Sequence, residues 1–149
     1  GIRDDLVTGV QTCALPIFID YIQNGYEIIL IGDMNDYDGE DANLDWQNNR
    51  PISKVLDILK GNAGLQKEKY ELTNIAYRIY KEDRYSDWWD SDENCETDSD
   101  KDYSMIDHIL VSDWVNDHIA DAFIYHGYKE YCGKYDSDHY PVVLDLLSS

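Results

Sequence analysis

The sequence of 149 residues predicts an α/β fold, as one domain or as a piece of a larger one. Three short runs, Tyr26–Ile31, Met105–Val111 and Tyr140–Leu146, are dense in aliphatic and β-branched residues, as buried strands are. Two other stretches, Phe18–Ile22 and Pro51–Leu59, repeat apolar residues at helical spacing. Strands and helices are therefore both present along the chain.

The N-terminal segment is set apart from the fold. Residues 7–17, VTGVQTCALPI, resemble the in-frame translation of a widely used sequencing-library adapter. We therefore expect residues 1–17 to be an artefact and the authentic chain to begin near Phe18. A signal peptide does not fit, because Asp4 and Asp5 stand where a positive region is required.

The first predicted helix ends at Asn24-Gly25, a common stop signal. Tyr26–Ile31 follows as a strand that we expect to be central in its sheet and to end at Gly32. The segment Asp36–Asn49 carries five acids and is expected to be a polar loop.

A second helix is predicted to begin at Pro51, a favoured first helical residue, and to end at Lys60-Gly61. Leu72–Tyr80 fits a short helix ambiguously, and Arg84–Trp89 has the composition of a strand. Asp90–Asp102 contains seven acids and one lysine, which predicts a solvated loop.

The last part of the chain contains three predicted strands. Met105–Val111 alternates so that Met105, Asp107, Ile109 and Val111 share one face and Ile106, His108 and Leu110 the other. Ala120–Tyr125 and Tyr140–Leu146 are the other two strands.

The composition limits the classes of function. A net charge of −19 without a basic stretch argues against binding to nucleic acid through a basic face. Acidic proteins act on phosphate esters when divalent cations neutralise the carboxylates and bridge to the substrate. No run approaches the roughly 20 apolar residues of a membrane span, so none is expected.

The cysteines leave the compartment open. Cys95 and Cys132 lie in polar stretches, where they would form a disulfide in an exported protein or remain two free surface thiols. Cys13 lies in the adapter-like segment, and no close pair of cysteines marks a zinc site.

Five polar residues at predicted strand ends and within a strand are candidates for a site. Asp107 stands among apolar residues, where an unpaired carboxylate would cost several kcal/mol, so a partner is expected. His139 is the proposed partner, because a carboxylate that orients an imidazole is a recurring active-site device. Asp33, Asn35 and Asp138 offer the oxygen ligands that Mg²⁺ prefers.

Three segments around these residues resemble motifs of the endonuclease/exonuclease/phosphatase superfamily. They are Gly32-Asp33-Met34-Asn35, Met105-Ile106-Asp107-His108-Ile109 and Ser137-Asp138-His139-Tyr140-Pro141-Val142, and they occur in the family's order. The resemblance implies the C-terminal half of a two-sheet α/β sandwich of the deoxyribonuclease I-like type, formed by residues 18–149.

The resemblance also implies a metal-dependent phosphodiesterase, most simply a nuclease acting on DNA or RNA. Asp33 would orient or deprotonate the attacking water, Asn35 would hold a phosphate oxygen, and His139 would stabilise charge on the phosphoryl group. Asp107 would hold His139. Asp138 and Asp33 would contribute to a Mg²⁺ site, with Mn²⁺ or Ca²⁺ as alternatives.

The early motifs of the family have no match in Gly1–Gly25. We therefore expect the intact parent to be the enzyme, and this chain alone to be inactive or nearly so and monomeric. The spacing of Arg84-Tyr85-Ser86 ahead of Ile106-Asp107-His108 is similar to broad-specificity, often secreted members, which favours secretion. Sphingomyelin-type lipid diesters and inositol phosphates are alternative substrates.

Non-enzymatic explanations are also open. Asp33 to Asn35 fits an ordinary Asx turn, and Asp138-His139 fits a loop before a strand. Asp98, Asp100 and Asp102 alternate as at the start of a calcium loop, but the glycine and the final glutamate of such a loop are missing. The rival hypothesis is an acidic Ca²⁺-binding interaction module.

Overall fold

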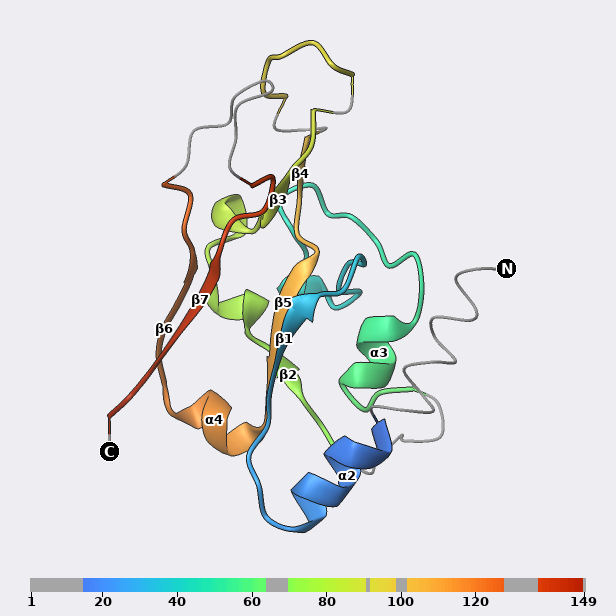
Figure 1. The fold of residues 1–149 in the computed structure, drawn as a ribbon, viewed down its shortest axis with the longest axis vertical. Coiled ribbons are helices and arrows are strands. Elements are labelled where there is room, and N and C mark those ends of the chain that lie inside the picture. The colour runs from blue at the N-terminus through green and yellow to red at the C-terminus, as the bar shows by residue number, and fades with distance from the viewer. Residues whose placement is uncertain (1–14, 64–69, 91, 99–101, 128–136, 149) are drawn as a thin grey trace.

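A computed structural model describes residues 15–63, 70–90, 92–98, 102–127 and 137–148 (Figure 1). These residues form a mixed α/β structure with antiparallel sheets. The predicted α/β character is therefore confirmed. The adapter-like residues 1–14 lie outside the described residues. None of the helices in the described part of the chain is long and apolar enough to cross a membrane.

The main sheet has three antiparallel strands in the order β1, β5, β2, which comprise Ile29–Asp33, Asp107–Val111 and Thr73–Asn74. The predicted central position of the first strand is wrong, because β5 lies in the middle and β1 at the edge of the described sheet. Ile29 and Ile31 are 42% and 65% exposed. An aliphatic run therefore identified a strand here but not its place in the sheet.

Two smaller antiparallel sheets complete the strands that the structure describes. One pairs β3 (Asp87–Trp88) with β4 (Tyr103–Ser104), and the other pairs β6 (Ile119–Ile124) with β7 (Val142–Leu146). The predicted strands at residues 120–125 and 140–146 are confirmed to within two residues, whereas the predicted strand Arg84–Trp89 is reduced to two residues.

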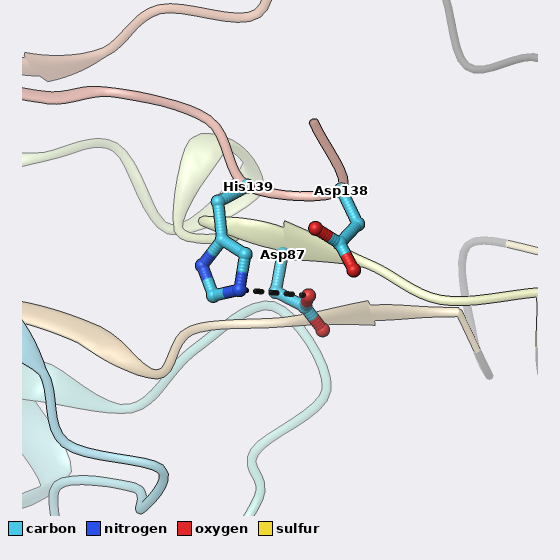
Figure 2. Close-up of side chains that lie close together, drawn as sticks. All are labelled: Asp87, Asp138 and His139. Carbon is cyan, nitrogen blue, oxygen red and sulfur yellow. Dashed lines mark ion pairs between the residues drawn. The ribbon is translucent and has the colours of Figure 1, made fainter. Parts of the chain in front are cut away.

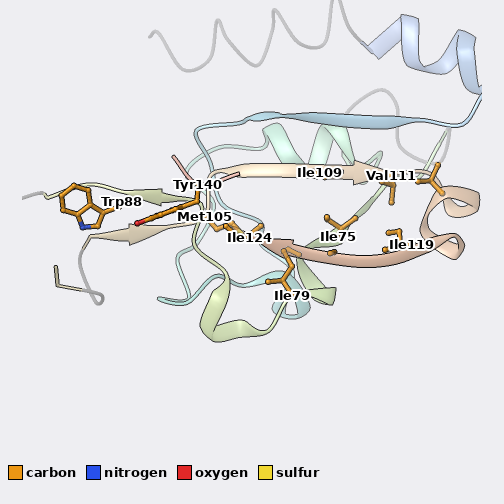
Figure 3. Packing of buried hydrophobic residues seen from close by; sticks show 12 residues of the cluster. Ile75, Ile79, Trp88, Met105, Ile109, Val111, Ile119, Ile124 and Tyr140 are labelled. Carbon is orange, nitrogen blue, oxygen red and sulfur yellow. The ribbon is translucent and has the colours of Figure 1, made fainter. Parts of the chain in front are cut away.

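The two faces of β5 pack against different partners. Ile109 and Val111 face β6 and β7 in a buried cluster that also contains Met105 (Figure 3). Leu110 points the other way, into a second cluster with residues of the helices α2 (Leu15–Gln23) and α3 (Val55–Leu59). The predicted alternation of this strand is confirmed. Each aliphatic side chain buried in this way contributes about 1.5–3 kcal/mol.

The second helix begins later than predicted. α3 starts at Val55 rather than Pro51, and the segment before it is held to the loop after β1, where the Asp36 carboxylate accepts the N–H groups of Ile52 and Ser53 at 2.7 and 3.0 Å. Its predicted end is confirmed. Gly61 has φ +83°, and a Cβ there would lie 2.0 Å from the Tyr70 carbonyl oxygen, so only glycine fits.

The remaining short elements resolve ambiguous parts of the sequence. Leu72–Tyr80 contains strand β2 followed by the 3₁₀ helix η3 (Ile75–Arg78), which Asn74 caps by accepting the Ala76 N–H at 3.1 Å. Two further 3₁₀ helices, η1 and η4, span Asp41–Asn43 and Lys81–Asp83. The helix α4 (Asp113–Asp117) was not predicted.

The acidic loop after β3 is disulfide-bonded. Cys95 forms a disulfide, which excludes the free-thiol alternative for this residue. Cys132, the partner considered from the sequence, lies outside the described residues.

Candidate active site

The register of the main sheet brings two of the predicted carboxylates together. Asp33 ends β1 and is paired directly with Asp107, the first residue of β5. The start of β5 is held by Ser86, a fully buried residue whose Oγ accepts the N–H groups of Ile106 and Asp107 at 3.2 and 3.0 Å. Asp33 and Asp107 are therefore fixed at the same end of the sheet by backbone hydrogen bonds.

The predicted contact between Asp107 and His139 is present. His139 Nδ1 lies 2.8 Å from Asp107 Oδ2, across 32 positions of sequence. An ionised carboxylate only accepts hydrogen bonds, so Nδ1 carries the proton. Nε2 is then turned away from Asp107, toward Asp87, whose Oδ1 lies 3.9 Å from it (Figure 2).

The surrounding charges favour the protonated form of His139. Its partial burial by itself favours the neutral ring. The hydrogen bond that His139 Nδ1 donates to Asp107 and the negative charges of Asp107, Asp87 and Asp138 outweigh this effect and raise the pKa of His139 above 6.5. The protonated imidazole is therefore favoured more than in a free histidine, and in that form Nε2–H is a donor on the side of Asp87.

Asp33 and Asn35 form one tight turn. The Asn35 N–H and its Nδ2 donate to Asp33 Oδ1 and Oδ2, at 2.8 and 3.0 Å. Asn35 has φ +48°, a left-handed conformation that asparagine tolerates better than most residues. This is the ordinary Asx turn that the non-enzymatic explanation of these residues expects. The same turn leaves both side chains exposed at the sheet end beside Asp107, so the turn does not exclude a role in binding.

Asp87 is a member of the site that the sequence reasoning did not identify. It pairs with His139 through an isolated antiparallel bridge, and Ser104 Oγ donates to its Oδ2 at 3.1 Å. Burial raises the pKa of Asp87. The signal was present in the sequence, because Asp87 precedes Trp88 in a predicted strand, just as Asp107 stands among apolar residues.

Arg84 and Ser86 belong to the triplet whose spacing is similar to that in often secreted members of the superfamily. In this structure both residues stabilise the backbone around the site. The Arg84 guanidinium is buried and donates to the carbonyl oxygens of Ala42 and Ile79, at 2.7 and 2.8 Å. Arg84 thus ties the loop after β1 to the segment after η3, while Ser86 holds β5.

Among the residues that the structure describes, Asp87, Asp138 and His139 have an arrangement that could hold a metal ion. One ligand atom from each lies within 4.8 Å of the others (Figure 2). Two carboxylates suit Mg²⁺, Mn²⁺ or Ca²⁺, whereas an imidazole nitrogen suits Mn²⁺ better than the other two. The predicted ligand Asp138 belongs to this cluster, and the other predicted ligand, Asp33, does not.

An open pocket of about 280 Å³ adjoins the Asp107–His139 pair. Apart from these two residues and His108, its lining is uncharged. It is made by Ile31, Gly32, Ile109, Tyr140, Pro141 and Val142. The pair therefore stands at the margin of a largely apolar hollow between β1, β5 and the segment that leads into β7.

Neither a protein-family model nor a curated protein matches the sequence. Function is therefore inferred from the chemistry of the site itself. Its parts are an imidazole oriented by a carboxylate, a second carboxylate in register with the first, and two further acids beside the imidazole.

Proposed function

We propose that this site belongs to a metal-dependent phosphodiesterase of the endonuclease/exonuclease/phosphatase type, most simply a nuclease. The single observation that supports this proposal most is the 2.8 Å contact of Asp107 with His139. The motifs quoted from the sequence support it further. In this proposal the described sheets are the C-terminal part of the family's two-sheet α/β sandwich, and the enzymatic activity belongs to the intact parent.

His139 acts in the proposal as the donor to the phosphoryl group. Asp107 fixes its Nδ1–H, so that Nε2–H is directed at the substrate and stabilises negative charge on a phosphoryl oxygen. The raised pKa of His139 supports this role, because a cationic ring is the stronger donor.

Asp33 and Asn35 act on the water and the phosphate. Asp33 accepts a proton from the attacking water or orients it, because its carboxylate is exposed at the sheet end opposite Asp107. Asn35 uses one amide hydrogen on Asp33 and has a second for a phosphate oxygen.

Asp138 is the proposed Mg²⁺ ligand that lies in the cluster with Asp87 and His139, whereas Asp33, the other proposed ligand, lies outside that cluster. When bound, the cation supplies a Lewis acid that neutralises charge on the phosphodiester. The donors fit this role through their carboxylates, with Mn²⁺ and Ca²⁺ as alternatives. The pocket lining includes no Lys or Arg, and His139 is the group in it that can carry positive charge, so a bound cation would add to the neutralisation that His139 supplies.

The test is a panel of plasmid DNA, RNA, sphingomyelin and inositol phosphates, each with and without Mg²⁺. The product of the complete reading frame is assayed beside the 149-residue chain, with Asp33→Ala and His139→Gln as variants. We expect Mg²⁺-dependent cleavage of a diester by the complete product, lost in both variants, and little or none by the chain alone. Cleavage that survives both variants would overturn the proposal.

The acidic-module hypothesis has a weaker basis in the structure. In the loop that follows β3, Asp90 Oδ2 accepts the N–H of Cys95 at 3.0 Å, and Asp102 Oδ2 accepts that of Asp98 at 2.7 Å. These carboxylates stabilise the loop itself. A calcium titration that leaves the melting temperature unchanged is expected; a clear rise would favour the module.

A further inference from the structure

Two successive residues of β5 point to opposite faces of the sheet, and each contacts a different part of the site. Asp107 contacts His139 on one face. His108 is 1% exposed and lies on the other face, where its Nε2 is 3.0 Å from the backbone oxygen of Asp36. Asp36 follows Asn35 directly, so His108 is joined to the Asp33–Asn35 turn.

The hydrogen-bond partners of His108 determine where its single proton lies. A carbonyl oxygen only accepts, so Nε2 must carry the hydrogen that reaches Asp36. Nδ1 is then a bare nitrogen, and it accepts from Asn74 Nδ2 at 3.0 Å. The orientation of the Asn74 amide is fixed independently, because its Oδ1 accepts the Ala76 N–H at 3.1 Å. Burial lowers the pKa of His108, in agreement with a neutral ring.

A buried ion pair fixes Asn74 in turn. The second hydrogen of Asn74 Nδ2 reaches Asp38 Oδ2 at 2.8 Å, and Asp38 Oδ1 accepts from Lys60 Nζ at 2.7 Å. The side chains of Lys60 and Asp38 are 1% and 0% exposed. Asp38 thus accepts from both Lys60 and Asn74, while the hydrogen bonds from Asn74 through His108 to the Asp36 carbonyl run in one direction, so the donor and acceptor of each contact are assigned.

This network holds the backbone on the C-terminal side of Asn35. On the other side of Asn35, the Met34 N–H donates to the Ile106 carbonyl at 2.9 Å. The Asp36 carboxylate accepts the N–H groups of Ile52 and Ser53. Asn35, with φ +48°, is thus held in the left-handed region between two anchored neighbours, a conformation that asparagine tolerates better than most residues.

We propose that His108 is a positioning residue of the site. Held by Asn74, Asp38 and Lys60 as its Nε2–H tautomer, it fixes the Asp36 carbonyl and so keeps Asn35 in the left-handed turn that presents its amide. The positioning itself does not depend on any activity. Its catalytic consequence rests on the proposed function, in which Asn35 holds a phosphate oxygen.

The first test is the tautomer of His108 in the unmodified 149-residue chain. Long-range ¹H–¹⁵N correlation spectra at pH 7 distinguish a protonated from a bare ring nitrogen. We expect Nε2 protonated and Nδ1 bare. A proton on Nδ1, alone or together with Nε2, would overturn the proposal. This measurement requires no variant, so a folding defect cannot obscure it.

The second test compares His108→Phe with His108→Gln, whose side-chain amide can still donate to the Asp36 carbonyl. The readout is the backbone conformation of Asn35, taken from its chemical shifts and its HN–Hα coupling. We expect conformational averaging in His108→Phe and recovery of the left-handed conformation in His108→Gln. Asn48, also left-handed with φ +60°, is the internal control and should not change.

An Asn35 conformation that is unchanged in folded His108→Phe would refute the positioning role. Equal disturbance of Asn35 and Asn48 would refute it as well, because it would show a general loss of structure. In the complete product, the same Phe variant should lower kcat by about 10- to 100-fold with a smaller effect on KM. An inactive wild-type product would count against the proposed function and leave both spectroscopic results valid.

Discussion

Replacing Lys60 with methionine is expected to destabilise the fold by about 3 kcal/mol. The substitution keeps most of the apolar stem and removes the ammonium that pairs with Asp38 at 2.7 Å. Both side chains are almost completely buried, so Asp38 would be left as a buried carboxylate without its cation.

The magnitude follows from the surroundings of Asp38. Removing one partner of a buried pair typically costs about 3–5 kcal/mol. Asp38 would retain the Glu40 N–H, Asn43 and Asn74 as donors, at 3.0, 3.1 and 2.8 Å. These neutral contacts disperse part of the charge, which places the cost at the lower end of the range. For a chain of this size, about 3 kcal/mol corresponds to roughly 6–12 °C in Tm.

Glu40→Gln is the matched control. Lys60 Nζ also lies 2.7 Å from Glu40 Oε1, but the Glu40 side chain is 51% exposed. Pairs of this kind contribute at most about 1 kcal/mol. Urea unfolding followed by tryptophan fluorescence, with the slope of the transition compared between variants, measures both effects.

A loss below about 1 kcal/mol in Lys60→Met, or losses of equal size in the two variants, would refute the reasoning, which assigns the stabilisation to the buried contact with Asp38. The double variant Lys60→Met with Asp38→Asn should cost less than the sum of the two single changes, because it removes the unpaired charge.

Four further predictions concern protonation. Asp107→Asn should lower the pKa of His139 more than Asp87→Asn does, measured by NMR titration; equal shifts would contradict the roles assigned to the two acids. Because the pKa of His139 is raised, its stabilising effect should be complete below pH 6.5 and disappear as the pH rises through its folded pKa. The opposite holds for His108, because burial lowers its pKa. Wild type should therefore lose stability relative to His108→Gln as the pH falls below 6.5. Urea unfolding at several pH values measures this difference. Burial raises the pKa of Asp38, but the hydrogen bonds that it accepts from Lys60, the Glu40 N–H and Asn74 outweigh burial and lower the pKa. The stability that ionised Asp38 contributes should therefore be complete above pH 3.8 and be lost in acid. The loss of stability in Lys60→Met should become smaller over the same pH range.

The strand around Asp107 could be predicted because two independent signals agree there. Strict alternation from Met105 to Val111 set the faces, and a carboxylate among apolar residues required a partner. His139, beside another acid at a strand boundary, was the natural candidate. Long-range pairing was therefore inferred from the cost of leaving a charge unpaired.

The buried network could not be predicted in the same way. Asp36 and Asp38 occur in a run of acids whose composition is that of a solvated loop, and both are nearly fully buried in the structure. The partners of Asp38, Lys60 and Asn74, lie 22 and 36 positions away, in segments that the sequence assigned to a helix end and an ambiguous stretch. Composition reports the average environment of a segment and cannot identify the few members that turn inward.

The edge position of β1 was missed for a related reason. Ile29 and Ile31 have the aliphatic character of a central strand, and both are exposed in the described sheet. β-propensity reports how well a side chain fits a pleated surface, whatever the position of the strand in its sheet. Only the pairing partners of β5 fix the order of the sheet.

We propose that Asp107 and His139 act as one unit on a phosphodiester. The most direct test of this proposal is the rate of Mg²⁺-dependent diester hydrolysis by the complete gene product, with and without Asp107→Asn, on samples shown to be equally folded. We expect a fall of about 10²- to 10⁴-fold, comparable to the loss of an orienting carboxylate in other imidazole-dependent sites. An unchanged rate in the folded variant would contradict the account.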